Sequence, residues 1–267
     1  MKTALFVGLI AVLLAGASLA QAEDGRSLCA NRPGKGSPPC VLDQGRFQVE
    51  VSGVDYSRDR TAGVTTETTL IGDLGLRYGL TPTLEAELAW SPYEQSRQHG
   101  GGPSSRTSGA GDLTLGFRKS LANPDGSGVS VAIQPFVTAP TGHSGIGADA
   151  WQGGVVVPVA IALSDSLGLG LTTEVDVAAN SSGHGSHAAG SFVVGLGKAV
   201  GPVSLGVELW TGVDDDPAGR TTQASFDLSA AWVPQSLPNL QFDVGLNAGL
   251  NPDTPDLEAY CGLARRF

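Results

Sequence analysis

The sequence is dominated by short stretches in which apolar residues alternate with polar or small ones. In the stretch DLTLGFR, apolar residues occupy every second position, at Leu113, Leu115 and Phe117. Similar stretches of about ten residues cover 167–178 and 240–250. A period of two is the pattern of a β-strand with one apolar face. No sustained helical period appears after residue 22, so we predict an all-β fold.

Counting these stretches gives about twelve strands. We predict them at 45–54, 64–78, 82–91, 111–121, 129–139, 150–163, 167–178, 189–199, 203–212, 222–233, 240–250 and 257–267. The connections alternate between short turns, such as 79–81, and longer polar loops, such as 55–63, 92–110 and 140–149. This organisation is typical of a transmembrane antiparallel β-barrel of the Gram-negative outer-membrane type, with periplasmic turns and extracellular loops. Because lipid cannot satisfy an open sheet edge, the barrel must close, and we assign it residues 44–267.

The outward-facing aromatic residues favour a barrel over a soluble β-sandwich, which would also show alternation. Near the short turns lie Phe47, Tyr78, Phe117, Trp232, Phe242 and Phe267. Near the long loops lie Trp90 and Trp151. Membrane barrels carry aromatic girdles at both interfaces, whereas the core aromatics of a sandwich have no reason to gather at strand ends.

The first residues have the features of a secretory signal peptide. Lys2 is followed by the apolar run LFVGLIAVLL and then by Ala20-Gln21-Ala22, a small-x-small cleavage pattern. The alternative, an uncleaved anchor helix, is disfavoured because a membrane-spanning helix needs about 20 apolar residues. We therefore predict a signal peptide over residues 1–22.

Two cysteines, Cys29 and Cys40, lie in the Pro/Gly-rich stretch that precedes the barrel. In an exported protein this spacing predicts a disulfide that closes a short loop. We expect residues 23–43 to form a periplasmic or lumenal segment, and we hypothesise that this segment enters the barrel as a plug. Cys261 stands alone in an apolar row, so we expect a buried or lipid-covered thiol.

The inward-facing positions of the predicted strands carry many charges, and carboxylates outnumber cations. The candidates for a pore lining are Arg77, Glu85, Glu87, Asp112, Arg118, Glu174, Asp176, Glu208, Asp227 and Asp243. Charges cannot face hydrocarbon cheaply, so they indicate a hydrated or internally paired lumen. Two interpretations remain open: paired ladders that brace the barrel, or a pore lining that favours cations and neutral polar solutes over anions.

Many other inward positions are glycines, and their missing side chains leave interior volume. Among them are Gly168, Gly170, Gly195, Gly197 and Gly206. A barrel of about twelve strands lies between the filled eight-stranded kind and the wide porins. A narrow channel is therefore expected, which the segment 23–43 could occupy.

All four histidines fall in predicted extracellular loops, at His99, His143, His184 and His187. His184 and His187 are close together in GHGSH, but solvated loop histidines are the commoner case, so we expect no metal site and no cofactor. A lipid hydrolase of the outer membrane would need a histidine in reach of a serine and an orienting third group. The loop pairs His143-Ser144 and Ser186-His187 have no evident third partner, so we do not expect an enzyme.

Several stretches carry a family resemblance. They are NRPGKGSPPCVLDQGRFQVEVSGVDY, IGDLGLRYGLTPTLEAEL, GAGDLTLGFRKSL, PFVTAPTG and DVGLNAGLNPDTPDLEAYCGLARRF. Together they span nearly all of the chain after the signal peptide and resemble the outer-membrane transporter family labelled MetA-pathway of phenol degradation. The resemblance implies an outer-membrane barrel proposed to pass small, often aromatic, substrates, and it carries over no catalytic residues.

The sequence therefore predicts a channel for passive uptake of small solutes in the outer membrane of a Gram-negative bacterium. The alternative is a structural or adhesion barrel with a plugged lumen. Expected partners are outer-membrane lipids, lipopolysaccharide, the solute, and the barrel-assembly machinery, which would recognise the last strand ending at Phe267. Without Lys2 the chain has 15 basic and 26 acidic residues, a net charge of −11, which argues against nucleic acid.

Overall fold

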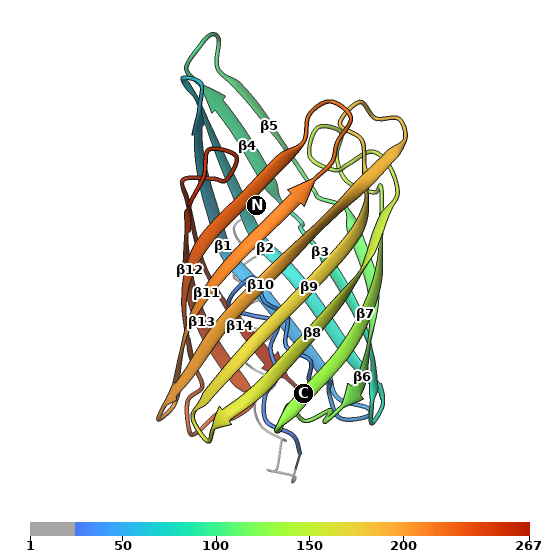
Figure 1. Ribbon diagram of the computed structural model, residues 1–267, viewed down its shortest axis with the longest axis vertical. Coiled ribbons are helices and arrows are strands. Elements are labelled where there is room, and N and C mark those ends of the chain that lie inside the picture. Colours follow the sequence, from blue (N-terminus) through green and yellow to red (C-terminus); the bar gives the residue numbers. More distant parts are fainter. Residues whose placement is uncertain (1–24) are drawn as a thin grey trace, which may run out of the picture.

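The computed structural model describes residues 25–267, and the predicted signal peptide over 1–22 lies outside the described residues. None of the described residues belongs to a helix that could span a bilayer. They form one sheet of fourteen antiparallel strands, which closes because β1 pairs with both β2 and β14 (Figure 1). The strands are β1 (Phe47–Thr61), β2 (Val64–Thr81), β3 (Leu84–Trp90), β4 (Glu94–His99), β5 (Ser105–Gly109), β6 (Leu113–Ala122), β7 (Val129–Ala139), β8 (Gln152–Ser164), β9 (Leu167–Ala179), β10 (Ser186–Val200), β11 (Val203–Asp214), β12 (Thr221–Trp232), β13 (Leu240–Gly249) and β14 (Leu257–Arg266).

Two of these strands continue others, and this sets the number of strands in the barrel wall. The long strand β2 pairs with β3 along one half and with β4 along the other. Strand β4 pairs in turn with β5, while β3 pairs with β6. Thus β4 continues β3, and β5 continues β6, each across a break of three residues. The wall has twelve strands, as the sequence predicts.

The expectation that 92–110 is a loop is wrong, because β4 and β5 form a hairpin that rises beyond the long-loop end of the wall (Figure 1). Its sequences, EQSRQH and SRTSG, have no apolar face, so alternation of hydrophobicity could not reveal them. Backbone hydrogen bonds to β2 hold the hairpin extended instead.

The predicted loop 55–63 is also mostly strand. β1 and β2 stay paired as far as Thr61 and Val64, and only Ala62 and Gly63 form the turn. Both turn residues have positive φ, 51° and 79°, which is the backbone of a tight two-residue hairpin.

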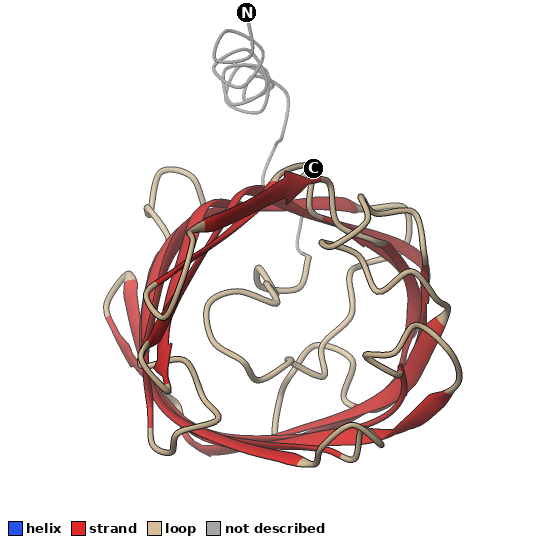
Figure 2. Cartoon of the chain, turned by 90° about the horizontal axis from the view of Figure 1, so that it is seen from above, coloured by secondary structure: helices blue, strands red, loops and turns tan. Residues whose placement is uncertain are grey.

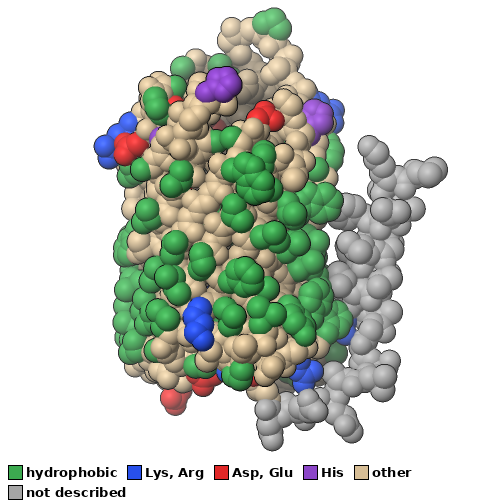
Figure 3. All heavy atoms as spheres, turned by 90° about the vertical axis from the view of Figure 1, so that its right-hand side faces the viewer, with side chains coloured by type: hydrophobic (Ala, Val, Ile, Leu, Met, Phe, Trp, Pro, Cys, Tyr) green, Lys and Arg blue, Asp and Glu red, His purple; other side chains and the backbone are tan. Residues whose placement is uncertain are grey.

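The outer surface of the barrel is apolar. Leu121, Trp151 and Val175 have exposed fractions of 62–66%, and the thiol of Cys261 is also exposed. Figure 3 shows hydrophobic side chains over the middle of the visible face, with histidine side chains towards one end and acidic side chains towards both ends. Charged side chains such as Arg77 and Arg118 are buried in the interior instead. This inside-out distribution suits a wall in contact with lipid.

The first and last strands close the barrel. β1 and β14 pair from Gln48 with Arg266 to Arg58 with Leu257. Beyond them, the backbone N–H of Phe267 donates to the carbonyl of Phe47 at 2.7 Å. The two phenylalanine rings lie with centroids 6.4 Å apart at the short-turn end. The last residue of the chain is therefore part of the closing seam.

The substitution Phe267→Ala should reduce the amount of folded barrel in the outer membrane, because it removes the ring contact with Phe47 and the expected assembly signal. Phe267→Tyr keeps the ring and should behave like the unchanged chain. Heat-modifiable gel mobility of membrane fractions measures the folded amount. Equal folded levels for the alanine and tyrosine variants would contradict the assignment of Phe267 to assembly.

Candidate functional site

The interior of the barrel holds residues 25–43, which we call the plug segment. Viewed from above, loop segments cross the inside of the ring of strands (Figure 2). The backbone N–H of Leu42 donates to Glu85 of β3 at 2.7 Å, and that of Lys35 donates to Glu208 of β11 at 2.8 Å. The N–H of Gly34 donates to the hydroxyl of Tyr260 of β14 at 2.9 Å. The plug segment is thus bonded to strands on several sides of the lumen.

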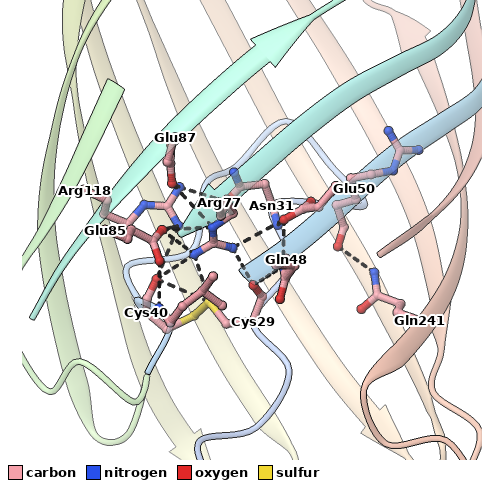
Figure 4. Close-up of polar contacts among 12 residues, drawn as sticks. Cys29, Asn31, Cys40, Gln48, Glu50, Arg77, Glu85, Glu87, Arg118 and Gln241 are labelled. Atoms are coloured by element: carbon pink, nitrogen blue, oxygen red, sulfur yellow. Dashed lines mark hydrogen bonds and ion pairs between the residues drawn. A yellow bond between two sulfur atoms is a disulfide. The ribbon is translucent and has the colours of Figure 1, made fainter. Parts of the chain in front are cut away.

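A disulfide between Cys29 and Cys40 folds the plug segment into a loop, with the two Cα atoms 6.2 Å apart. The carbonyl oxygens of both cysteines accept hydrogen bonds from the guanidinium of Arg77, a residue of β2 (Figure 4). Arg118 of β6 also donates to the Cys40 carbonyl, at 3.3 Å. Two wall arginines therefore hold the base of this loop.

These arginines belong to a buried charge cluster of Glu50, Arg77, Glu85, Glu87 and Arg118 (Figure 4). Arg77 Nη2 lies 2.6 Å from Glu85 Oε1, and Arg118 Nη2 lies 3.0 Å from Glu87 Oε1. Arg77 Nη1 also lies 3.4 Å from Glu50 Oε1. The side chains are 10% exposed or less. Because solvent is excluded, each charge depends on the others for its stabilisation.

A second set of contacts joins the plug segment to β11, β13 and β14. Arg32 forms an ion pair with Asp243 at 3.0 Å, and Lys35 Nζ forms one with Glu258 at 3.0 Å. The same cations also lie over lumenal aromatic rings. Arg32 is 5.5 Å from the ring centre of Tyr260, and Lys35 is 4.8 Å from that of Trp210. Charge and cation–π contacts therefore act together on this side.

Of the sequence candidates, Arg77, Glu85, Arg118, Glu208 and Asp243 contact the plug segment directly. Glu87 takes part through its ion pairs with the two arginines. The structure thus brings most of the candidates to the surface of the plug rather than to an open pore.

Asp112 has a different position and a different task. Its two carboxylate oxygens accept hydrogen bonds from the backbone N–H groups of Gly142 and Ala148, at 2.7 and 2.8 Å. It therefore fastens the loop 140–149 to the end of the wall. The contact falls in the break between β5 and β6.

The other three candidates, Glu174, Asp176 and Asp227, lie away from the plug contacts described above. Glu174 and Asp176 of β9 line a cavity of about 280 Å³ near the long-loop end, together with Trp210. Asp227 of β12 is buried, and its carboxylate has no hydrogen-bond partner among the described residues. These carboxylates form the acidic side of the lumen.

Three cavities follow one another along the lumen. The outer cavity just described and a middle cavity of about 270 Å³ are both lined by Glu174. The middle cavity and an inner cavity of about 320 Å³ share Asn31 and Ser37 of the plug segment. The inner cavity lies between the plug segment and the glycine-bearing wall of β9, β10 and β11. Residual space thus runs past the plug segment on one side.

The prediction that His99 and His187 lie in loops is wrong, because His99 is the last residue of β4 and His187 is the second residue of β10. His187 also has acidic neighbours. Its Nε2 lies 2.9 Å from Asp214 Oδ1. Asp216 lies close by, and hydrogen bonds from the backbone N–H groups of Ala218 and Ser181 hold its pKa below the usual range. These neighbours of His187 come from the end of β11 and the loop after it, which are distant in sequence, so spacing alone could not reveal them.

The serine–histidine pairs do not form a hydrolase site. His143 Nδ1 contacts the carbonyl oxygen of Ser144 at 2.8 Å, not a hydroxyl. His187 Nδ1 contacts Asn180 Oδ1 at 2.9 Å, so Ser186 is not its partner there. Neither histidine is placed to activate its neighbouring serine.

Fold and interior together define a transmembrane β-barrel of the outer-membrane type whose lumen holds a segment of its own chain. The chain belongs to the family described as "Putative MetA-pathway of phenol degradation", which matches residues 30–267, so the predicted family is confirmed.

Two solved structures have a similar fold. The NanC porin has a TM-score of 0.50 and 8% identity, over 82% of this chain and 98% of that one. The translocator domain of autotransporter NalP from Neisseria meningitidis has a TM-score of 0.50 and 12% identity, over 84% and 89%. A comparison with curated protein sequences gives no match. Both likenesses show the barrel fold.

The substitution Glu85→Gln should destabilise the folded barrel by about 3–5 kcal/mol, because it removes from the buried cluster the carboxylate that pairs with both Arg77 and Arg118. Urea unfolding in lipid vesicles measures the change. The matched control, Asp256→Asn, removes the exposed pair with Arg60, whose side chains are 57% and 45% exposed, and should cost about 0–1 kcal/mol. Equal small effects for both variants would contradict the importance of the buried cluster.

Proposed function

We propose that the protein is an outer-membrane channel that lets small solutes pass between the plug segment and the opposite barrel wall. The observation that carries this proposal is the succession of outer, middle and inner cavities, in which neighbouring cavities share lining residues. A solute would enter beside Glu174, pass Asn31 and Ser37, and leave near the short turns. Diffusion down a gradient needs no further machinery.

The two sides of the lumen support this route because they differ in chemistry. The wall of β2, β3 and β6 is filled by the charge cluster and the plug segment. The facing wall carries Gly168, Gly170 and Gly197, and a Cβ atom added at Gly197 would meet nothing within 4 Å. Glycine at these positions therefore leaves the space open.

The solutes we propose are small, and neutral or positively charged. Glu174 and Asp176 line the outer cavity, and fixed carboxylates attract cations and repel anions. Phe136 in the middle cavity and Trp210 in the outer one add apolar ring faces, which suit small organic compounds, aromatic ones included.

The proposed location is the outer membrane of a Gram-negative bacterium, with lipopolysaccharide and outer-membrane lipids around the apolar wall. The apolar outer surface and the twelve-stranded closure support this location. The barrel-assembly machinery is proposed to receive the chain through β14 and Phe267.

Gly197→Trp should lower single-channel conductance in planar bilayers by roughly half or more, because the indole would occupy much of an inner cavity of about 320 Å³. Val207→Trp is the matched control, since Val207 of the neighbouring strand β11 is 41% exposed and lines none of the three cavities. It should leave conductance unchanged. If the barrel without any substitution shows no conductance, the proposal is overturned. That result would favour the structural or adhesion barrel, in which the buried ion pairs hold the plug segment in a closed lumen.

The double substitution Glu174→Gln, Asp176→Asn should reduce the preference for cations over anions, because it removes two negative charges from the outer cavity. Reversal potentials in a salt gradient measure this preference. Asp165→Asn, in the exposed turn between β8 and β9, removes a charge outside the cavities and serves as the control. Anion preference of the unchanged channel would contradict the proposed selectivity.

A further inference from the structure

A cluster of metal-binding side chains lies at the extracellular rim, beside the entrance of the proposed route past the plug segment. His187 is the second residue of β10, Asp214 ends β11, and Asp216 lies in the loop that follows. One potential ligand atom from each residue can be chosen so that all three atoms lie within 4.8 Å of one another. Imidazole nitrogen with carboxylate oxygen is a donor set suited to Zn²⁺ and similar divalent ions.

The hydrogen bonds around His187 fix the direction of its ring. Asn180 Nδ2 donates to the carbonyl of His184 at 2.8 Å, so Asn180 Oδ1 is the amide atom directed at the ring. This oxygen can only accept, and it lies 2.9 Å from His187 Nδ1, so Nδ1 carries a proton. The other ring nitrogen, Nε2, is then the atom available as a ligand, an arrangement common for metal-bound histidines.

The surroundings of Nε2 favour a positive charge beside the Asp214 carboxylate. Nε2 is buried without a hydrogen-bond partner among the described residues, although Asp214 Oδ1 lies only 2.9 Å away. The His187 side chain is 5% exposed. A neutral ring would turn its lone pair towards a carboxylate in a poorly solvated place, which is unfavourable. A cation bound between these two atoms removes the repulsion.

The two carboxylates are held in place and remain accessible. Asp216 accepts backbone hydrogen bonds from Ser181 and Ala218, both at 2.7 Å, so its orientation is fixed before any ligand arrives. Asp214 accepts one from the Asp216 N–H at 3.0 Å, and its side chain is 45% exposed. Each carboxylate oxygen has more than one lone pair, so these bonds leave room for a ligand.

We propose that His187, Asp214 and Asp216 form a binding site for a divalent transition-metal ion of the Zn²⁺ type, with a remaining position open to water. The ion would join the start of β10 to the end of β11 and to the loop that follows β11. Asp214 also lines the outer cavity, so the bound ion would reduce the negative charge at the mouth of the lumen. The site does not depend on conduction by the channel.

Zn²⁺ titration by calorimetry tests the site, on protein purified through a tag without histidines and stripped with a chelator. We expect one ion per chain. His187→Gln and Asp214→Asn should each weaken binding by at least about tenfold, since even partners beyond the ligands change metal affinity by such factors. His184→Gln is the matched control, because His184 is exposed in the loop before β10. This substitution should leave binding unchanged.

Two further measurements keep the result unambiguous. Heat-modifiable gel mobility shows whether each variant is folded. The variant Asp214→Asn changes a half-exposed side chain and leaves the buried imidazole ring of His187 in place. The titration is repeated with Cys261→Ser, because Cys261 is a free exposed thiol that could bind zinc. No binding by the unchanged chain, binding lost with Cys261→Ser, or equal affinity of folded His187→Gln would overturn the proposal. None of these outcomes bears on whether the channel conducts.

Discussion

The hydrocarbon of a membrane offers no hydrogen-bond partner, and the rest of this structure depends on that constraint. A sheet in lipid must satisfy every backbone N–H and carbonyl within itself, so it must close. Here β1 closes against β14, and the pairing continues as far as Phe47 and Phe267. Closure also sends alternate side chains inward, where every charge must find water or a partner. The arrangement of the lumen follows from this second demand.

The chain meets that demand with a segment of itself. Arg77 and Arg118 are buried in the wall and are compensated partly by Glu85 and Glu87, partly by the carbonyl groups of the disulfide loop. Backbone carbonyls accept charge-assisted hydrogen bonds without adding another charge. The plug segment therefore supplies hydrogen-bond acceptors to the two arginines without placing further carboxylates beside Glu85 and Glu87. The buried arginines lie on the wall of β2 and β6, and the wall of β9, β10 and β11 with its glycines keeps the residual space. An asymmetric plug of this kind occupies the lumen without filling the barrel.

The sequence predicted the barrel well because lipid imposes a strict alternation on every spanning strand. It failed where that constraint ends. The hairpin β4–β5 lies beyond the membrane and is polar on both faces, so no period marks it. In the lumen, the alternation along the strands identified residues such as Glu85 and Glu208 as inward-facing. It could not show that the backbone N–H groups of Leu42 and Lys35 would donate hydrogen bonds to them. Contacts of the plug segment depend on the path of an irregular chain, which leaves no periodic signal. The surroundings of His187 could not be predicted for a related reason. Asp214 is brought close to His187 only by the pairing of β10 with β11.

The contacts of the plug segment also link its docking to the closure of the barrel. Arg32 pairs with Asp243 of β13, and Arg266 of β14 donates to the carbonyl oxygens of Arg26 and Ser27. These partners lie at opposite ends of the sequence, more than 200 residues apart. The contacts on this side of the plug segment therefore cannot form until the last two strands are in place. The strand that completes the wall is also the strand that completes the lumen, so an open barrel would lack both its seal against lipid and one side of its plug.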